Sequence, residues 1–179
     1  PRRGADAVAV AIVLDRRSVV FHLTAAARQQ FPAVIVDSPL AFTLRAPSLL
    51  GAIETVRLFL PHIRRGGSIQ FITTFLTQVG FPGLAIYSAS KAALKSFAQT
   101  LAAELAPRGI RVNSIAPGPI GTPLWGTVGL PPDVLAAVAE KINARLMPGS
   151  FGQPDDIAEL SVFLASDGAM NIYGQDIVV

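Results

Sequence analysis

The 179-residue sequence contains no cysteine, which excludes disulfide bridges and thiolate metal sites and suits a reducing compartment. Its two histidines, His22 and His62, have no second ligand at metal spacing, so we expect no bound metal. No apolar run is long enough to span a membrane. The formal charge is +3, but the arginines stand singly or in pairs, without interleaved aromatic residues. We therefore expect a cytoplasmic protein with no membrane or nucleic-acid partner.

The composition is 51% hydrophobic, which is typical of an α/β fold whose parallel strands are buried on both faces. Apolar segments alternate with amphipathic ones along the whole chain. The segments expected as strands are 7–14, 33–36, 68–73, 111–115 and 176–179. The segments expected as helices are 18–30, 48–63, 87–105 and 155–165, with a lid region at 124–146. The order predicts a single domain over residues 1–179, built on a doubly wound parallel sheet with helices on both faces.

The most informative motif is Tyr-x-x-x-Lys, formed by Tyr87 and Lys91. On a helix, residues four apart lie on the same face, so the spacing places a phenol beside an ammonium group. A nearby cation favours the phenolate and lowers the pKa of the tyrosine toward the working range of an enzyme. The same spacing also occurs in ordinary surface helices, so the motif needs support from neighbouring segments.

Two neighbouring segments supply that support. Thirteen residues before Tyr87, Thr74 follows a predicted strand, at the sheet edge where open α/β sheets bind their ligands. After the helix, the predicted strand at 111–115 leads into a rigid Pro-Gly-x-x-x-Thr loop at 117–122. Taken together, these segments resemble the catalytic half of the short-chain dehydrogenase/reductase family. The resemblance runs from about residue 12 to residue 179.

The resemblance implies a catalytic role for four residues. Tyr87 is the general acid toward a substrate carbonyl and the general base in reverse, and Lys91 supports it and binds the nicotinamide ribose. Thr74 stands where the family usually has serine and keeps the hydroxyl that bonds the substrate oxygen. Ser48 falls near the family's structural asparagine. The implied reaction interconverts a small-molecule carbonyl and an alcohol with NADP or NAD, which the sequence does not distinguish.

The loop at 117–122 is implied to contact the nicotinamide: Pro117 and Gly118 lie against the ring, while Ile120 and Thr122 hold its carboxamide. Apolar residues of the lid region, including Trp125, favour a substrate with an apolar body.

The sequence also departs from the family pattern. It shows no glycine-rich turn between a first strand and helix, where the family binds the cofactor pyrophosphate. It begins like the third strand of the family, so about two strands and two helices of that pattern are missing from the sequence. The family's adenine-contacting aspartate falls at Ile12, and Pro39 and Leu40 replace parts of its Asn-Asn-Ala-Gly segment. We therefore expect the chain alone to bind the dinucleotide weakly.

Two alternatives to a reductase stay open at this level. One is a non-catalytic homologue, suggested by Ile12, Pro39 and the missing glycine-rich turn. The other is a lyase like the halohydrin dehalogenases, which use arginine where this sequence has Lys91. We also expect a homodimer or homotetramer formed through the helices at 48–63 and 87–105. The apolar residues that suggest this interface are Leu94, Phe97, Leu101 and Leu105.

Overall fold

The computed structural model describes residues 9–13, 31–37, 47–123, 125 and 131–179. Its strands are β1 (Ala9–Val13), β2 (Phe31–Asp37), β3 (Ile63–Ile72), β4 (Arg111–Ala116) and β5 (Asp176–Val178). Its helices are α1 (Pro47–Phe59), α2 (Ala85–Leu105), α3 (Pro132–Asn143) and α4 (Pro154–Ala165), with short 3-10 turns η2 (Leu60–His62), η3 (Phe75–Thr77), η4 (Ala106–Arg108) and η6 (Asp167–Ala169). The predicted helix at 18–30 lies outside the described residues.

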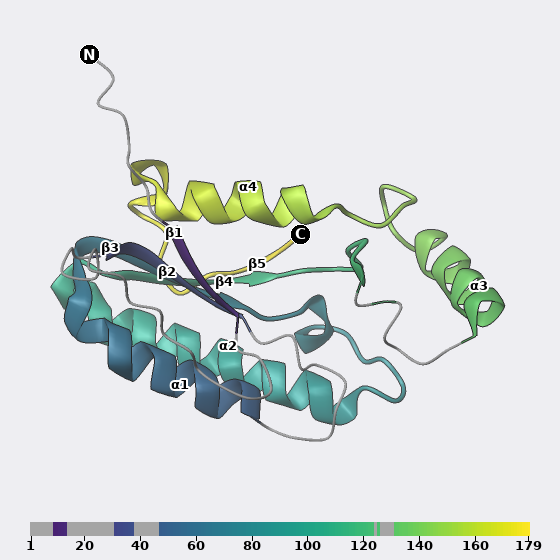
Figure 1. Cartoon of the computed structure of the whole chain (residues 1–179), viewed down its shortest axis with the longest axis horizontal. Helices are drawn as coiled ribbons and strands as arrows, with labels where there is room; N and C mark the ends of the chain where they lie inside the picture. Colours follow the sequence, from purple (N-terminus) through teal and green to yellow (C-terminus); the bar gives the residue numbers. More distant parts are fainter. Residues whose placement is uncertain (1–8, 14–30, 38–46, 124, 126–130) are drawn as a thin grey trace, which may run out of the picture.

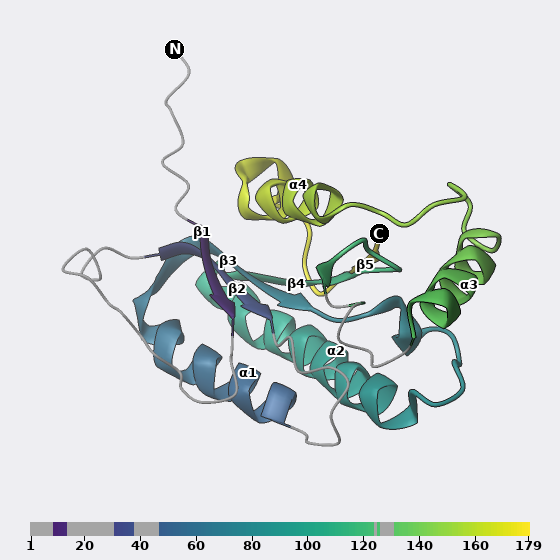
Figure 2. The same ribbon diagram turned by 45° about the vertical axis from the view of Figure 1, so that its right-hand side comes forward.

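All five strands are parallel and lie in the sheet in the order β1-β2-β3-β4-β5. Helices α1 and α2 cover one face of the sheet and α4 covers the other (Figures 1 and 2). Helix α3 lies apart from both layers, beyond the carboxyl ends of the strands (Figure 1). The predicted α/β class, with a parallel sheet and helices on both faces, is confirmed.

The two faces of the sheet carry different cores because successive side chains of a strand point to opposite sides. Ile69 and Phe71 of β3 pack with α1 and α2, and the ring of Phe71 meets Phe97 edge to face. On the other face, Ile115 of β4 and Leu164 of α4 are fully buried together. This face also holds polar residues. Gln70 Nε2 donates to the carbonyl of Ser161, and the Ser161 hydroxyl donates to Gln70 Oε1.

Two element boundaries differ from the sequence prediction by more than two residues. The helix predicted at 48–63 ends at Phe59, because Pro61 lies in η2 and Ile63 already starts β3. Gly66 and Gly67, which precede the strand predicted at 68–73, lie inside β3. Gly66 has a positive φ of 84°, and the pairing of β2 with β3 shifts register at this end. A glycine is needed there because other residues seldom adopt that conformation.

The prediction that four apolar residues of α2 form a dimer interface is wrong. Leu94, Leu101 and Leu105 are buried in the core of their own chain, and Phe97 packs against that core. Among the described residues, the large hydrophobic side chains that α1 and α2 expose are Leu50, Ile53, Leu58 and Ile86.

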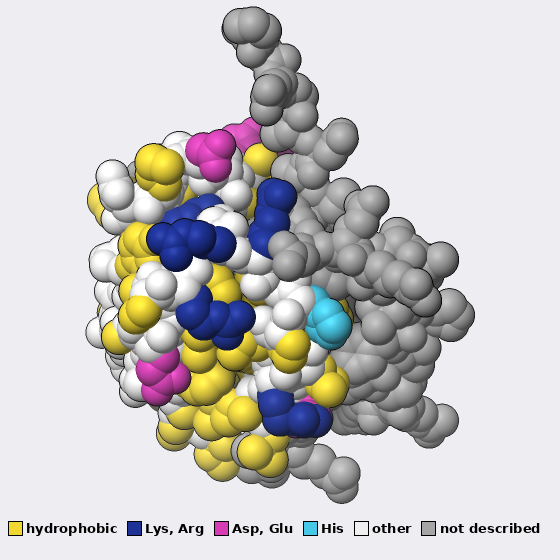
Figure 3. Space-filling view, turned by 90° about the vertical axis from the view of Figure 1, so that its left-hand side faces the viewer, with side chains coloured by type: hydrophobic (Ala, Val, Ile, Leu, Met, Phe, Trp, Pro, Cys, Tyr) yellow, Lys and Arg dark blue, Asp and Glu magenta, His cyan; other side chains and the backbone are white. Residues whose placement is uncertain are grey.

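The end of the molecule where β3 begins displays its Lys and Arg side chains as separate groups among neutral and hydrophobic atoms (Figure 3). The space-filling view of this end shows no continuous basic band over the described residues. Within the described part of the chain, every helix is too short or too polar to cross a bilayer.

Candidate active site

Thr74 lies just beyond the carboxyl end of β3, where it caps η3. Its backbone is extended, with φ −165° and ψ 148°, and its hydroxyl accepts a hydrogen bond from the backbone N–H of Leu76 at 3.4 Å. The next residue, Phe75, donates its backbone N–H to the carbonyl of Pro117 at 3.2 Å. Thr74 is buried, and this bond ties its segment directly to the loop that follows β4.

Tyr87 lies in the first turn of α2 and Lys91 lies one turn later on the same face. The Tyr87 side chain is half-buried, whereas Lys91 is only 3% exposed. The Lys91 ammonium donates to the carbonyl oxygen of Ile72 at 2.7 Å. Because Ile72 ends β3, this bond anchors the lysine two residues from Thr74. A buried ammonium group needs such partners to offset its lost hydration.

A second lysine of α2 reaches the same end of the sheet. The Lys95 ammonium lies 3.1 Å from Oδ2 of Asp176, the first residue of β5. The other carboxylate oxygen accepts a hydrogen bond of 2.6 Å from the Thr73 hydroxyl, which also lies 3.1 Å from the Ile115 carbonyl. The segment that precedes Thr74 is thus joined to α2, β4 and β5.

The loop after β4 is held in place by backbone hydrogen bonds on both sides. Gly118 donates to the carbonyl of Val179 at 2.7 Å, and a side chain on Gly118 would begin only 3.2 Å from that oxygen. Ile120 and Gly121 run beside Gly152, which donates to the Pro119 carbonyl at 3.0 Å and accepts from Gly121 at 2.9 Å. The loop that contains all four predicted nicotinamide contacts, Pro117, Gly118, Ile120 and Thr122, therefore has a defined path.

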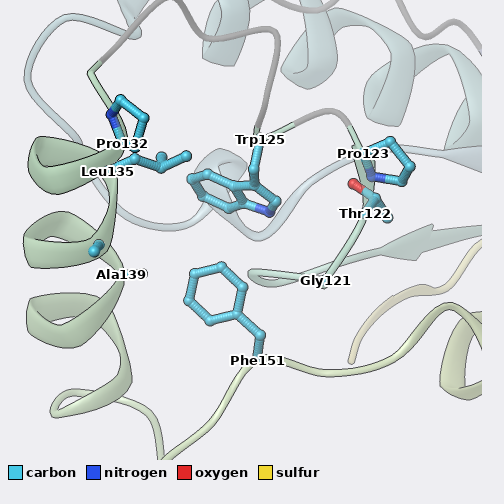
Figure 4. A pocket seen from close by; sticks show the side chains of 9 residues that line it. Gly121, Thr122, Pro123, Trp125, Pro132, Leu135, Ala139 and Phe151 are labelled. Carbon is cyan, nitrogen blue, oxygen red and sulfur yellow. The ribbon is translucent and has the colours of Figure 1, made fainter.

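A pocket of about 520 Å³ lies between this loop and α3. Figure 4 shows the rings of Trp125 and Phe151 pointing into the space between Leu135 of α3 and the Gly121–Pro123 segment. The two ring centroids are 5.0 Å apart, and the indole N–H of Trp125 donates to the Ile120 carbonyl at 2.7 Å. The lining residues are Gly121, Thr122, Pro123, Trp125, Pro132, Leu135, Ala136, Ala139 and Phe151.

The structure brings Thr74, Tyr87, Lys91 and the loop at 117–122 to one edge of the sheet, beyond the carboxyl ends of the strands. Ser48 lies in the first turn of α1, and its side chain falls outside the described residues, as do Pro39 and Leu40. Sequence reasoning missed two contributors. Asp176 was predicted only as part of a strand, without its ion pair to Lys95. Phe151 was not predicted at the site, because its contact with Trp125 joins residues far apart in the chain.

Comparison with known proteins gives consistent matches. The sequence family described as enoyl-(acyl carrier protein) reductase matches residues 6–179. A 3-oxoacyl-[acyl-carrier-protein] reductase of Thermotoga maritima is 37% identical over 130 residues, which cover 72% of this chain and 50% of the relative. An L-fucose dehydrogenase of Oryctolagus cuniculus is 39% identical over 124 residues, which cover 68% of this chain and 43% of the relative. The chain thus spans about half the length of these curated relatives or less.

Among solved structures, a short-chain dehydrogenase/reductase of unknown function from Caenorhabditis elegans, determined with cofactor, matches with a TM-score of 0.74. It is 25% identical, and the match covers 84% of this chain and 64% of that one. A dehydrogenase/reductase from Sinorhizobium meliloti matches with a TM-score of 0.70 at 28% identity, over 84% of this chain and 62% of that one.

Proposed function

Because the chain belongs to the short-chain dehydrogenase/reductase family of oxidoreductases, we propose that the protein interconverts a carbonyl compound and an alcohol with NADP or NAD. The observation that carries this proposal is the placement of Tyr87, Lys91 and Thr74 at one edge of the sheet, with the lysine buried and anchored to the Ile72 carbonyl. In an ordinary Tyr-x-x-x-Lys pair on a helix surface, the lysine ammonium would stay in water, because charged groups are seldom buried.

The described residues fit the nicotinamide end of such a cofactor. The loop from Pro117 to Thr122 has its path set by bonds to Val179 and Gly152, and it runs beside the Thr74 segment through the Phe75 to Pro117 hydrogen bond. Lys91 carries an ammonium with three donors, the chemistry that ribose hydroxyls require. Lys91, Ile120 and Thr122 would hold the group, and Pro117 and Gly118 would lie against it. When bound, the nicotinamide supplies or accepts the hydride.

In this mechanism the protein moves one proton at the substrate oxygen. The Tyr87 hydroxyl donates its proton to the carbonyl oxygen during reduction and takes it back during oxidation. The Lys91 charge stabilises the phenolate that reduction leaves behind. The Thr74 hydroxyl bonds the same substrate oxygen and so orients it toward Tyr87.

Replacement of Tyr87 by phenylalanine tests the proposal. Tyr87→Phe should lower kcat for NADPH- or NADH-dependent ketone reduction by about 10²- to 10⁴-fold, the usual contribution of a positioned general acid, and leave the unfolding midpoint nearly unchanged. The chain has two tyrosines. The matched control is therefore Tyr173→Phe, because Tyr173 lines a separate pocket with Gly109 and Arg111, and this change should leave turnover intact. Turnover by Tyr87→Phe at the wild-type rate would refute the assignment.

A further inference from the structure

We propose that the pocket between α3 and the loop after β4 receives an uncharged hydrocarbon group next to the reacting carbonyl, and that Trp125 and Phe151 select for it. This inference rests on the proposed function and adds the substrate class. The pocket volume, about 520 Å³, lies within the range of sites for small organic molecules. Both a cycloalkyl ring and a straight alkyl chain are uncharged hydrocarbon groups of this kind.

The lining explains why a hydrocarbon fits better than a polyol. None of the described residues that line the pocket carries a charge, and the side chains that meet there are mainly those of Trp125, Phe151, Leu135 and two prolines. Among these side chains, Thr122 supplies a hydroxyl, while the indole N–H of Trp125 already donates to the Ile120 carbonyl. Most hydroxyls of a bound sugar would lose water without gaining a protein partner, and that loss is unfavourable.

Trp125 also connects this pocket to the proposed cofactor loop. Its indole N–H binds the carbonyl of Ile120, the residue whose backbone we assign to the nicotinamide carboxamide. Its ring packs on Phe151, which immediately precedes Gly152 and the Pro119–Gly121 contacts. A substrate group that packs against the Trp125 indole therefore lies beside the loop residues that orient the nicotinamide ring. Phenylalanine or leucine at position 125 offers no such donor.

Helix α3 provides the room in the pocket through two small residues. Ala136 and Ala139 both line it and lie three residues apart, on one side of the helix. A leucine at either position would extend into the space that a substrate needs. Ala137 is the matched control because it is exposed on the same helix and does not line the pocket.

The first test measures binding and does not depend on turnover. Trp125 is the sole tryptophan of the chain, so its emission reports on the pocket directly. With and without NADPH, cyclohexanol and 2-octanol should change this emission saturably. Ala139→Leu or Ala136→Leu should weaken that binding at least tenfold, and Ala137→Leu should not. Saturable binding of neither alcohol, tighter binding of L-fucose, or equal effects of all three substitutions would overturn the proposal.

The second test measures specificity through kcat/KM for cyclohexanone, 2-octanone and acetone. Ala139→Leu should raise KM for the two larger ketones about tenfold or more. It should leave KM for acetone nearly unchanged, because the methyl groups of acetone are too small to occupy the pocket. The two larger ketones distinguish a ring from a chain as the preferred group. A uniform loss for all three would refute selection by the pocket. If no ketone turns over while the alcohols still bind as expected, the proposed reaction fails and the hydrocarbon site stands.

Discussion

The ammonium group of Lys95 lies 3.1 Å from the carboxylate of Asp176, an ion pair that joins α2 to β5. The same carboxylate accepts the Thr73 hydroxyl at 2.6 Å. One turn earlier on the helix, Lys91 binds the Ile72 carbonyl. Helix α2 is therefore tied to the end of β3 twice, once directly and once through Asp176, and this double attachment sets the position of the segment that leads to Thr74.

We expect Lys95 and Asp176 to be energetically coupled. The Asp176 side chain is 4% exposed, so removing its cation leaves a nearly buried carboxylate without its counter-charge. In a double-mutant cycle with Lys95→Met and Asp176→Asn, urea unfolding should give a coupling free energy of about 0.5–3 kcal/mol. The solvent-exposed Arg57–Glu54 pair is the control, and its cycle should show much weaker coupling. Additive effects for Lys95 and Asp176 would contradict this expectation.

A series at Thr74 separates the hydroxyl from the methyl group. Thr74→Ser keeps the hydroxyl that caps η3 and, in the proposed mechanism, bonds the substrate oxygen, so kcat should stay within a few-fold of wild type. Thr74→Val keeps the shape but loses both bonds, and kcat should fall by about tenfold to a hundredfold, the scale of one lost hydrogen bond to a charged group. Steady-state kinetics are the measurement. Equal rates for the Ser and Val variants would exclude a role for the hydroxyl.

Arg111 holds the carboxyl-terminal end of α4 onto the sheet. Its guanidinium donates to the carbonyl oxygens of Leu164, Ala165, Ser166 and Ala169. Burial lowers the pKa of Arg111 from its ordinary value, because desolvation disfavours the charged form. The hydrogen bonds to these carbonyls therefore offset part of the hydration that the guanidinium loses.

Arg111→Lys cannot reproduce the planar fork and should destabilise the protein by about 1–3 kcal/mol, the cost of leaving buried carbonyls unsatisfied. Denaturant unfolding measures the change. The exposed Arg64, replaced by lysine as a control, should change stability little. A stability of Arg111→Lys equal to wild type would show that the carbonyls find water instead.

A dimer interface over α1 and α2 remains a prediction, now based on the exposed residues. Ile53 and Ile86 are 38% and 59% exposed on these helices. Burying them against a second copy removes apolar surface from water. Ile53→Glu combined with Ile86→Glu should shift sedimentation from dimer or tetramer toward monomer at micromolar concentration. Val134→Glu, an exposed site on α3, should leave the oligomer unchanged. A monomeric wild type would refute the interface.

The sequence by itself determined the alternation of strands and helices, the one-face pairing of Tyr87 with Lys91, and the rigid loop after β4. Each of these depends on residues close together in the chain, because apolar periodicity, helical spacing and proline act locally.

The tertiary structure alone decided which distant residues meet. Gly66 lies in β3 because pairing with β2 extends that strand, and Leu94, Leu101 and Leu105 serve the core of their own chain because the sheet covers them. The contacts of Lys95 with Asp176 and of Trp125 with Phe151 depend on how α2, β5 and the loop after β4 pack together. Such pairings have no local signature, since the free energy that selects them comes from burial and hydrogen bonding across the whole fold.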